Sequence, residues 1–326
     1  DEIIVELESE AVSLEEIVAI GYGGVKKKEL TGAVAQLNAD DISNAVTSDL
    51  ASALQGQVAG VNVTASSGAP GAQSGVLIRG LSSIGGSNQP LYVVDGVPFD
   101  GDPGIDPNQI ETVDILKDAA SAAIYGTRGA AGVILITTKQ GKAGTLKVDV
   151  NARYGIQNVT SATPLMNAAE QTYFNMVRVR NVSGTPDDEI ILNLAQSPRG
   201  FLNDTDLREL VFIKNAATQD YNVNISGGTD NLTYNVMASV YSNDGVIVNS
   251  AFDRINTRAN TTYKKGKWRI NASIGMTNES IDRSPGGIIT QTITYYPTQP
   301  TLDLEDDSPI YSQIGDETNR LNWVIE

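Results

Sequence analysis

The sequence predicts an α+β globular domain followed by antiparallel strands of a transmembrane β-barrel. Three observations support this fold class. The first 142 residues mix short apolar runs, helical patches and glycine-rich turns. From Thr145 onward, apolar and polar residues alternate with a period of two, as in a strand with two different faces. Short and long connections then follow one another in strict order between these strands.

The globular part is assigned from short elements. Residues 42–54 predict a helix that leads into two glycines, and residues 110–125 predict a strand followed by a short alanine-rich helix ending at Gly126. Short buried strands are expected at residues 76–79, 91–94 and 133–138 because apolar runs there are bounded by turn residues.

Five later segments show the alternation of a strand, at residues 145–155, 221–226, 232–241, 254–263 and 267–277. In the first, Val148 and Val150 alternate with Asp149 and Asn151. A tilted strand needs about ten residues to cross a bilayer, which is close to these lengths. A soluble antiparallel sheet with one wet face would give the same alternation, so the pattern alone leaves both alternatives open.

The connections favour the membrane alternative. Residues 227–231 and 264–266 are tight turns, whereas residues 156–220 and 242–253 and the chain after 278 are long. Transmembrane barrels have short periplasmic turns and long outer loops. The longest loop has helical patches near residues 168–179 and 187–194, and residues 288–296 could add a sixth strand. Since a barrel that holds a plug needs about 22 strands, we expect this chain to be part of a larger barrel.

Composition limits the classes of function. The 326 residues include 39 Asp and Glu against 23 Lys and Arg, a net charge of -16, so no nucleic-acid partner is expected. The chain has no cysteine and no histidine, which removes disulfides, cysteine zinc sites and histidine general bases. No run of about 18 apolar residues predicts a transmembrane helix. We therefore predict no enzymatic activity, no cofactor and no metal site.

Four successive blocks resemble the plug domain of TonB-dependent transporters, at residues 75–80 (GVLIRG), 90–97 (PLYVVDGV), 110–117 (IETVDILK) and 132–139 (GVILITTK). Residues 15–32 and 54–61 resemble the opening of the SusC/RagA subfamily. The resemblance implies that residues 1–10 end a small β-sandwich domain, 11–25 hold the TonB box, 26–142 form the plug, and 143–326 form the first strands and outer loops of a roughly 22-stranded barrel.

The resemblance also implies a function in the bacterial outer membrane. It implies TonB-dependent active import of large nutrients, either oligosaccharides or peptides, with the plug gated by pulling on the TonB box. The implied partners are TonB with ExbB and ExbD, a SusD-like surface lipoprotein and outer-membrane lipid, and a dimer of transporter–lipoprotein pairs is left open. The alternatives are a surface glycan- or peptide-binding or adhesion barrel without transport, and a signalling receptor, which would need a further periplasmic domain upstream.

Three groups of candidate site residues follow from the resemblance. A flexible apolar segment can add a strand to the sheet edge of a partner, although an ordinary linker strand would look the same. The expected TonB-binding residues are Glu16, Ile17, Val18, Ala19 and Ile20. Arg79 and Arg128 are expected to form a latch with carboxylates of the barrel wall, and an ordinary salt bridge is the alternative.

The residues proposed to contact substrate lie in the loop after Gly80. They are Ser82, Ser83, Ser87, Asn88 and Gln89, whose polar groups suit sugar hydroxyls or peptide backbone. Any loop rich in Gly, Ser and Asn has this composition, so a purely structural role stays open. Four aspartates, at positions 95, 100, 102 and 106, cluster near Gly and Pro. They lack a calcium-loop signature, and turn chemistry is the preferred interpretation.

Overall fold

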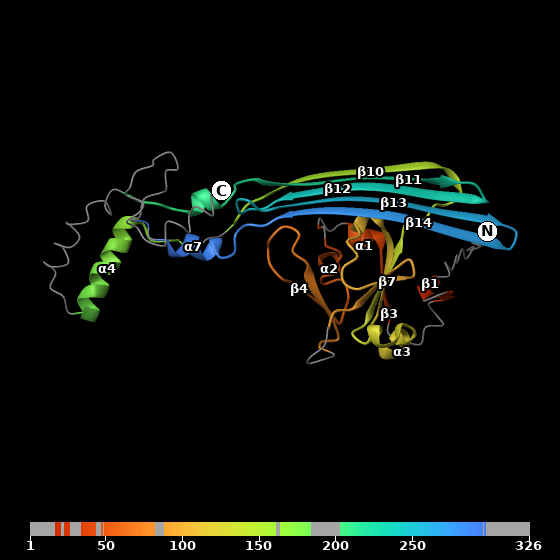
Figure 1. The fold of residues 1–326 in the computed structure, drawn as a ribbon, viewed down its shortest axis with the longest axis horizontal. Helices are drawn as coiled ribbons and strands as arrows, with labels where there is room; N and C mark the ends of the chain where they lie inside the picture. Colours follow the sequence, from red (N-terminus) through yellow and green to blue (C-terminus); the bar gives the residue numbers. More distant parts are fainter. Residues whose placement is uncertain are drawn as a thin grey trace, which may run out of the picture.

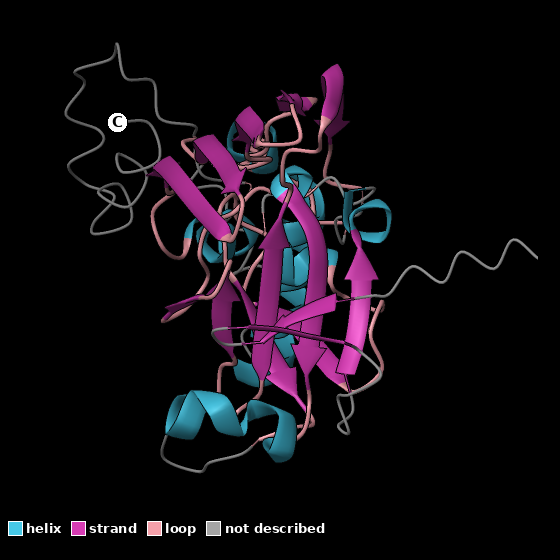
Figure 2. Ribbon diagram, turned by 90° about the vertical axis from the view of Figure 1, so that its right-hand side faces the viewer, coloured by secondary structure: helices cyan, strands magenta, loops and turns pink. Residues whose placement is uncertain are grey.

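The computed structural model describes residues 17–20, 23–26, 34–43, 47, 49–81, 88–160, 164–183, 203–295 and 297. A long sheet lies across a globular domain, and helices extend beyond one end of this sheet (Figure 1). Figure 2 turns the molecule by 90°, so that the long strands are seen close to end-on above the globular domain. Among the described residues, no helix is both long and apolar enough to span a membrane.

A five-stranded sheet forms the centre of the globular domain. Its order is β3 (Val34–Asn38), β8 (Ile110–Leu116), β9 (Val133–Thr138), β6 (Leu91–Val94) and β7 (Val97–Phe99). β6 and β9 are parallel, and the other neighbours are antiparallel. On β9, Ile134 and Ile136 belong to one apolar cluster, whereas Val133 and Leu135 belong to another. Because side chains alternate along a strand, the two clusters cover opposite faces of the sheet.

The smaller elements surround this sheet. They are the hairpins of β1 (Ile17–Ile20) with β2 (Gly23–Lys26) and of β4 (Val61–Ala65) with β5 (Ser74–Ile78), the helices α1 (Ala39–Ser43), α2 (Leu50–Ala53) and α3 (Ala119–Ala122), and the 3-10 helices η2 (Pro107–Gln109) and η3 (Ala123–Gly129). The single helix predicted for residues 42–54 is therefore wrong. Asp49 has an extended backbone and accepts a hydrogen bond from the Ala51 amide, so it begins a second helix. The Asp49 carboxylate also accepts from the Ser74 amide at 3.1 Å, which ties α2 to β5.

The long sheet confirms the five predicted strands. They are β10 (Gly144–Gln157), β11 (Ala216–Gly228), β12 (Leu232–Asp244), β13 (Ala251–Lys265) and β14 (Trp268–Asp282), antiparallel and in sequence order. Each is longer than predicted because polar residues at the ends continue the ladder, as where Lys265 pairs with Trp268 beside the turn. We call the end with the tight turns the turn end, and the opposite end the loop end.

The two faces of the long sheet are inverted relative to a soluble protein. Apolar side chains on the outer face are open, with Val150 65% and Ile274 75% exposed. On the three central strands, β11 to β13, polar side chains of the other face are buried, with Asn235 1% and Asn260 2% exposed. A soluble sheet would bury the first set and expose the second. This arrangement fits a barrel wall whose apolar face meets lipid and whose polar face meets the lumen.

The loop end carries α4 (Ala168–Ser183), α6 (Arg208–Val211) and α7 (Ile288–Thr294). α4 confirms the helical patch predicted near residues 168–179, while residues 187–194 lie outside the described residues. The strand considered for residues 288–296 is wrong, since α7 occupies most of this range. Ile288 and Thr292 are buried four residues apart, a helical spacing that so short a run of β-branched residues did not reveal.

Candidate functional site: a polar ring between the globular domain and the long sheet

Asp95 is held at the edge of the globular domain by a tight hairpin. The two-residue turn between β6 and β7 consists of Asp95 and Gly96, with φ values of 48° and 88°. Asp-Gly is the preferred sequence of such a turn because both residues tolerate positive φ. The Asp95 carboxylate accepts hydrogen bonds from the Thr138 amide at 2.9 Å and from the Thr138 hydroxyl at 2.7 Å. The end of β9 therefore fixes the orientation of this carboxylate.

The long sheet supplies the partners of this pair. Asn260 on β13 and Ser273 on β14 lie directly opposite each other, and Arg258 lies two residues from Asn260 on the same face. The Asn260 amide nitrogen donates to the Thr138 hydroxyl and to the Lys139 carbonyl, each at 2.9 Å. The Ser273 hydroxyl donates to the Asn260 side-chain oxygen at 2.6 Å.

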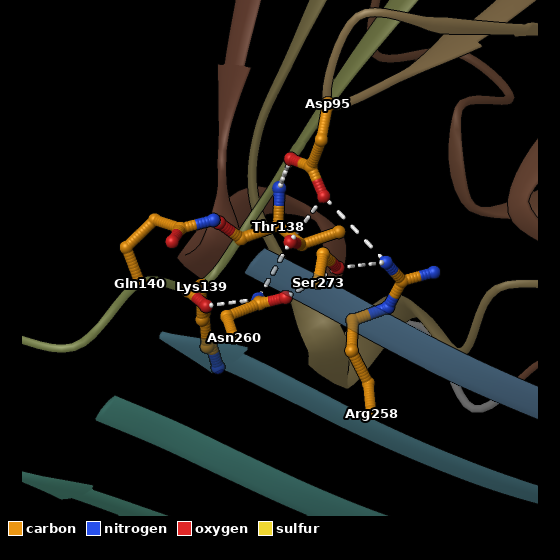
Figure 3. Close-up of polar contacts among 7 residues, drawn as sticks. All are labelled: Asp95, Thr138, Lys139, Gln140, Arg258, Asn260 and Ser273. Carbon is orange, nitrogen blue, oxygen red and sulfur yellow. Dashed lines mark hydrogen bonds and ion pairs between the residues drawn. The ribbon is translucent and has the colours of Figure 1, made fainter. Parts of the chain in front are cut away.

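Arg258 closes these contacts into a ring. Its Nη1 atom lies 3.5 Å from Asp95 Oδ2 and donates to the Ser273 hydroxyl at 3.3 Å. Asp95, Thr138, Asn260, Ser273 and Arg258 thus form a closed circuit of polar contacts, which we call the polar ring (Figure 3). Each hydroxyl in the circuit both donates and accepts. Thr138 and Asn260 are buried, and the side chains of Arg258 and Asp95 are only 14% and 21% exposed, so loss of one member leaves polar groups at this interface unsatisfied.

The segment after β9 also packs closely on the long sheet. A Cβ added to Gly141 would lie 2.4 Å from the backbone nitrogen and oxygen of Tyr234 on β12. No other residue fits between the two backbones, so glycine is required for this approach. The segment leaving the globular domain therefore runs in contact with the wall formed by β12 and β13.

A second contact region lies on β13 and β14, farther from the turn end than the ring. Arg254 Nε lies 2.9 Å from Glu279 Oε1, and the Arg254 guanidinium lies 5.0 Å from the centre of the Phe252 ring. The globular domain meets this group with two glycines. A Cβ on Gly71 would lie 2.4 Å from the Phe252 ring, and one on Gly104 would lie 3.0 Å from Glu279 Oε1. The globular domain therefore packs closely against the long sheet at both contact regions.

Asp102 adds a titratable group beside this second region. Burial raises the pKa of the Asp102 carboxyl, and the nearby carboxylates of Asp49 and Glu279 raise it further, whereas a hydrogen bond from the Gly104 amide and the charge of Arg254 oppose the shift. Burial also raises the pKa of the Tyr92 hydroxyl, with Asp102 and Asp49 adding to the effect. The Asp102 carboxyl and the Tyr92 hydroxyl therefore both hold their protons more tightly than they would in water.

The residues predicted to bind TonB are described in part. Glu16 lies outside the described residues, and residues 17–20 form β1, which pairs antiparallel with β2. The segment thus has the strand conformation that sheet addition requires, and its pairing with TonB stays a prediction.

The two arginines predicted as a latch lie on the globular domain. Arg79 is exposed, has a φ of 58° and donates its backbone amide to the Gly60 carbonyl at 2.9 Å. Arg128 forms an ion pair with Asp100 at 2.6 Å, in which both side chains are well exposed. Both contacts lie within the globular domain, and pairing of these arginines with the wall stays a prediction.

The predicted substrate residues precede β6. Ser82, Ser83 and Ser87 lie outside the described residues, while Asn88 is half-buried and Gln89 is exposed. The clustered aspartates make turn and cap contacts, as where Asp102 accepts from the Gly104 amide at 2.9 Å and Asp106 accepts from the Asn108 amide at 2.7 Å. No group of acidic side chains in the described ranges is arranged to hold a metal ion.

The wall side of the polar ring was not predicted from the sequence. Arg258 and Asn260 belong to β13, a strand whose alternation predicts its two faces but not the partners of single residues. Arginine and asparagine on the polar face of a barrel strand are the available signal, because that face must meet the lumen or a domain within it. Their partners on the globular domain require the three-dimensional structure.

Comparison with known proteins agrees with this architecture. The family model for the TonB-dependent Receptor Plug Domain matches residues 26–133. TonB-dependent receptor P39 of Formosa agariphila is 33% identical over 302 residues, which cover 92% of this chain and 28% of the relative. TonB-dependent receptor SusC of Bacteroides thetaiotaomicron is 32% identical over 315 residues, covering 92% of this chain and 30% of the relative.

Solved structures give the same result. The RagAB peptide importer in its open-open state aligns with a TM-score of 0.72 and 28% identity, over 82% of this chain and 33% of that chain. Its closed-closed state aligns with a TM-score of 0.69 and 27% identity, over 77% of this chain and 31% of that chain. The likeness covers the globular domain together with the long sheet, rather than either one alone.

A plug docked on the polar face of an inverted sheet, together with these relatives, defines a TonB-dependent receptor of the bacterial outer membrane. The chain spans about 30% of the length of the curated relatives that it matches. Within this class, the chain is a plug with the first barrel strands of a SusC/RagA-type TonB-dependent transporter.

Proposed function

We propose that the complete protein imports large nutrients across the outer membrane and that TonB drives this import by pulling on residues 16–20. The polar ring is the observation that carries the proposal. It attaches the plug to the lumenal face of the wall through individually modest contacts that a directed pull can break one after another.

The remaining assignments follow from the proposed import. We assign the loop end to the outside and the turn end to the periplasm. β1, which lies toward the turn end (Figure 1), would then be on the side where TonB acts. Arg79 and Arg128 would latch onto wall carboxylates. The loop at residues 82–89 would present polar groups to an arriving substrate. A SusD-like surface lipoprotein would cover the outer end and release cargo to the plug.

Two substrate classes fit the relatives. The RagAB structures are of a peptide importer, and SusC is a second receptor at comparable identity. We propose oligosaccharides or peptides as the cargo of this protein. Native mass spectrometry of the detergent-extracted complex would identify the class, because a bound small oligomer of either chemistry has a characteristic repeat mass. The same spectrum would show whether a lipoprotein is bound and whether the pairs dimerise.

The direct test removes residues 16–20 from the complete protein. We expect growth on the cognate nutrient to stop while surface binding of that nutrient is retained, because only the connection to TonB is lost. A matched control deletes the five residues 6–10, which precede the TonB box in the sequence. Undiminished growth of the 16–20 deletion would refute active import and would support a surface-binding barrel without transport.

A further inference from the structure

A cavity of about 750 Å³ lies between the plug and the wall at the turn end. Asp95 and Ser273 line it and are also members of the polar ring, so the ring closes one end of this cavity. The cavity is bounded on one side by the segment that leaves β9, at residues 140–143, and on the other by β12, β13 and β14. Opening of the ring would therefore extend the cavity along the wall.

The wall beyond the ring continues as a row of polar side chains. The register of β13 and β14 places cross-strand pairs on the lumenal face at regular intervals. From the turn end they are Lys264 with Arg269, Thr262 with Asn271, Asn260 with Ser273, Arg258 with Gly275, Asn256 with Thr277, and Arg254 with Glu279. This row supplies hydrogen-bonding side chains at every step.

The first pair of the row carries charge of one sign. Lys264 and Arg269 are directly opposite each other, and like charges in such a position destabilise a sheet. Lys142 lines the same cavity and forms an ion pair with Glu111 at 3.4 Å. The acids among the lining residues are Asp95, which is engaged in the polar ring, and Asp230. A chain with a net charge of -16 thus places three cations around one cavity. An anionic group that enters would relieve the repulsion within the cross-strand pair.

We infer that cargo passes the plug along the lumenal faces of β13 and β14, and that the cation-lined cavity at the turn end favours cargo bearing carboxylates or other anionic groups. This inference rests on the proposed import function and specifies its route. The polar ring is the gate on this route. Among the strands that the structure describes, the cavity is bounded by β12, β13 and β14, and no residue of β10 or β11 lines it.

The route can be tested by the accessibility of single cysteines, since this chain has no cysteine of its own. In the complete transporter, Asn271→Cys should react with an anionic sulfonate thiol reagent in the resting state. Asn256→Cys, which is 2% exposed, should react only when Arg258→Gln and Asn260→Ala open the ring. Asn222→Cys on the lumenal face of β11 is the control and should stay protected in both backgrounds. Absence of labelling at position 271, or equal exposure of positions 222 and 256 in the opened protein, would overturn the route.

The charge preference is measured with a pair of reagents at Asn271→Cys. We expect the anionic reagent to outpace a cationic one of equal size. Substitution of both Lys264 and Arg269 by Gln should lower this rate ratio by about tenfold or more, as expected for two unit charges roughly 6 Å away in water. Lys265→Gln is the matched control because it removes a cation from the same turn on the outer face. An unchanged ratio would refute the anion preference.

These measurements use neither TonB nor a nutrient. They therefore distinguish failure of the route from failure of the proposed function. The deletion of residues 16–20 can leave growth intact while the labelling confirms the route. Equally, the deletion can stop growth while the labelling refutes the route.

Discussion

Removal of the Arg258 guanidinium should loosen the plug at its attachment to the wall. The Arg258 side chain is 14% exposed and that of Asp95 is 21% exposed, so their charges interact in a partly desolvated setting. At 3.5 Å and an effective dielectric constant of about 20, the attraction is roughly 5 kcal/mol before desolvation is subtracted. Desolvation takes back much of this, and Asp95 keeps its contacts with Thr138. We expect Arg258→Gln to cost about 2 kcal/mol.

Hydrogen exchange of the complete transporter measures this cost directly. The Asn260 side-chain amide donates to Thr138 and Lys139 across the interface, so it becomes exchangeable when the interface opens. A loss of about 2 kcal/mol corresponds to roughly thirty-fold faster exchange of this amide. Arg208→Gln is the matched control, since Arg208 pairs with Asp206 at the loop end, where the exposed pair contributes little.

A double-mutant cycle isolates the ion pair from the rest of the ring. Asp95→Asn and Arg258→Gln are combined, and the difference between the double variant and the sum of the single variants gives the coupling energy. We expect a coupling of about 1 to 3 kcal/mol. A coupling below about 0.5 kcal/mol, or unchanged exchange in Arg258→Gln, would show that the plug is held by other contacts.

Three further predictions concern the fit between plug and wall. Gly141→Ala should speed exchange across the interface as strongly as Arg258→Gln, because its Cβ would collide with strand backbone; Gly68→Ala, which has open space around it, should leave exchange unchanged. Gly71→Ala should lower the unfolding temperature of the plug, since φ is +68° and the Phe252 ring is in the way; an unchanged melting curve would contradict that packing. Asp102→Asn should stabilise the plug at pH 7 and have no effect below pH 3.8, the ordinary pKa of the carboxyl. Because the pKa is raised, the stability contributed by protonated Asp102 is fully present below pH 3.8 and is lost as pH rises through the raised pKa. Chemical unfolding at several pH values would check this profile.

Much of the fold was predictable because the long strands repeat one pattern. The alternation of Val148 and Val150 with Asp149 and Asn151 identified a strand with two different faces, and the tight turns fixed its neighbours. The alternation did not say which face meets solvent. Burial of Asn235 and exposure of Ile274 decide this, and both depend on the docked plug and on lipid outside the barrel.

The site was less predictable for a physical reason. The polar ring joins residues 95 and 138 to residues 258, 260 and 273, and such distant pairings depend on how two folded units dock. The resemblance directed attention to arginines on the plug and carboxylates on the wall. In the polar ring the polarity is reversed, with the carboxylate of Asp95 on the plug and the guanidinium of Arg258 on the wall. The prediction of one helix over residues 42–54 was wrong because a capping residue, Asp49, begins a second helix within the same apolar pattern.

The position of β3 has a mechanical consequence for the proposed pull. β3 is an edge strand of the plug sheet, whereas the ring is attached at the far ends of β9 and β6. A load applied ahead of β3 reaches Val34 first, where it pairs with Leu116. An edge strand loaded at one end is peeled off residue by residue, at a lower force than simultaneous rupture of the whole ladder. The remaining four strands can stay anchored to the wall while β3 is removed. The plug can therefore unfold in steps and refold onto the strands that stayed in place.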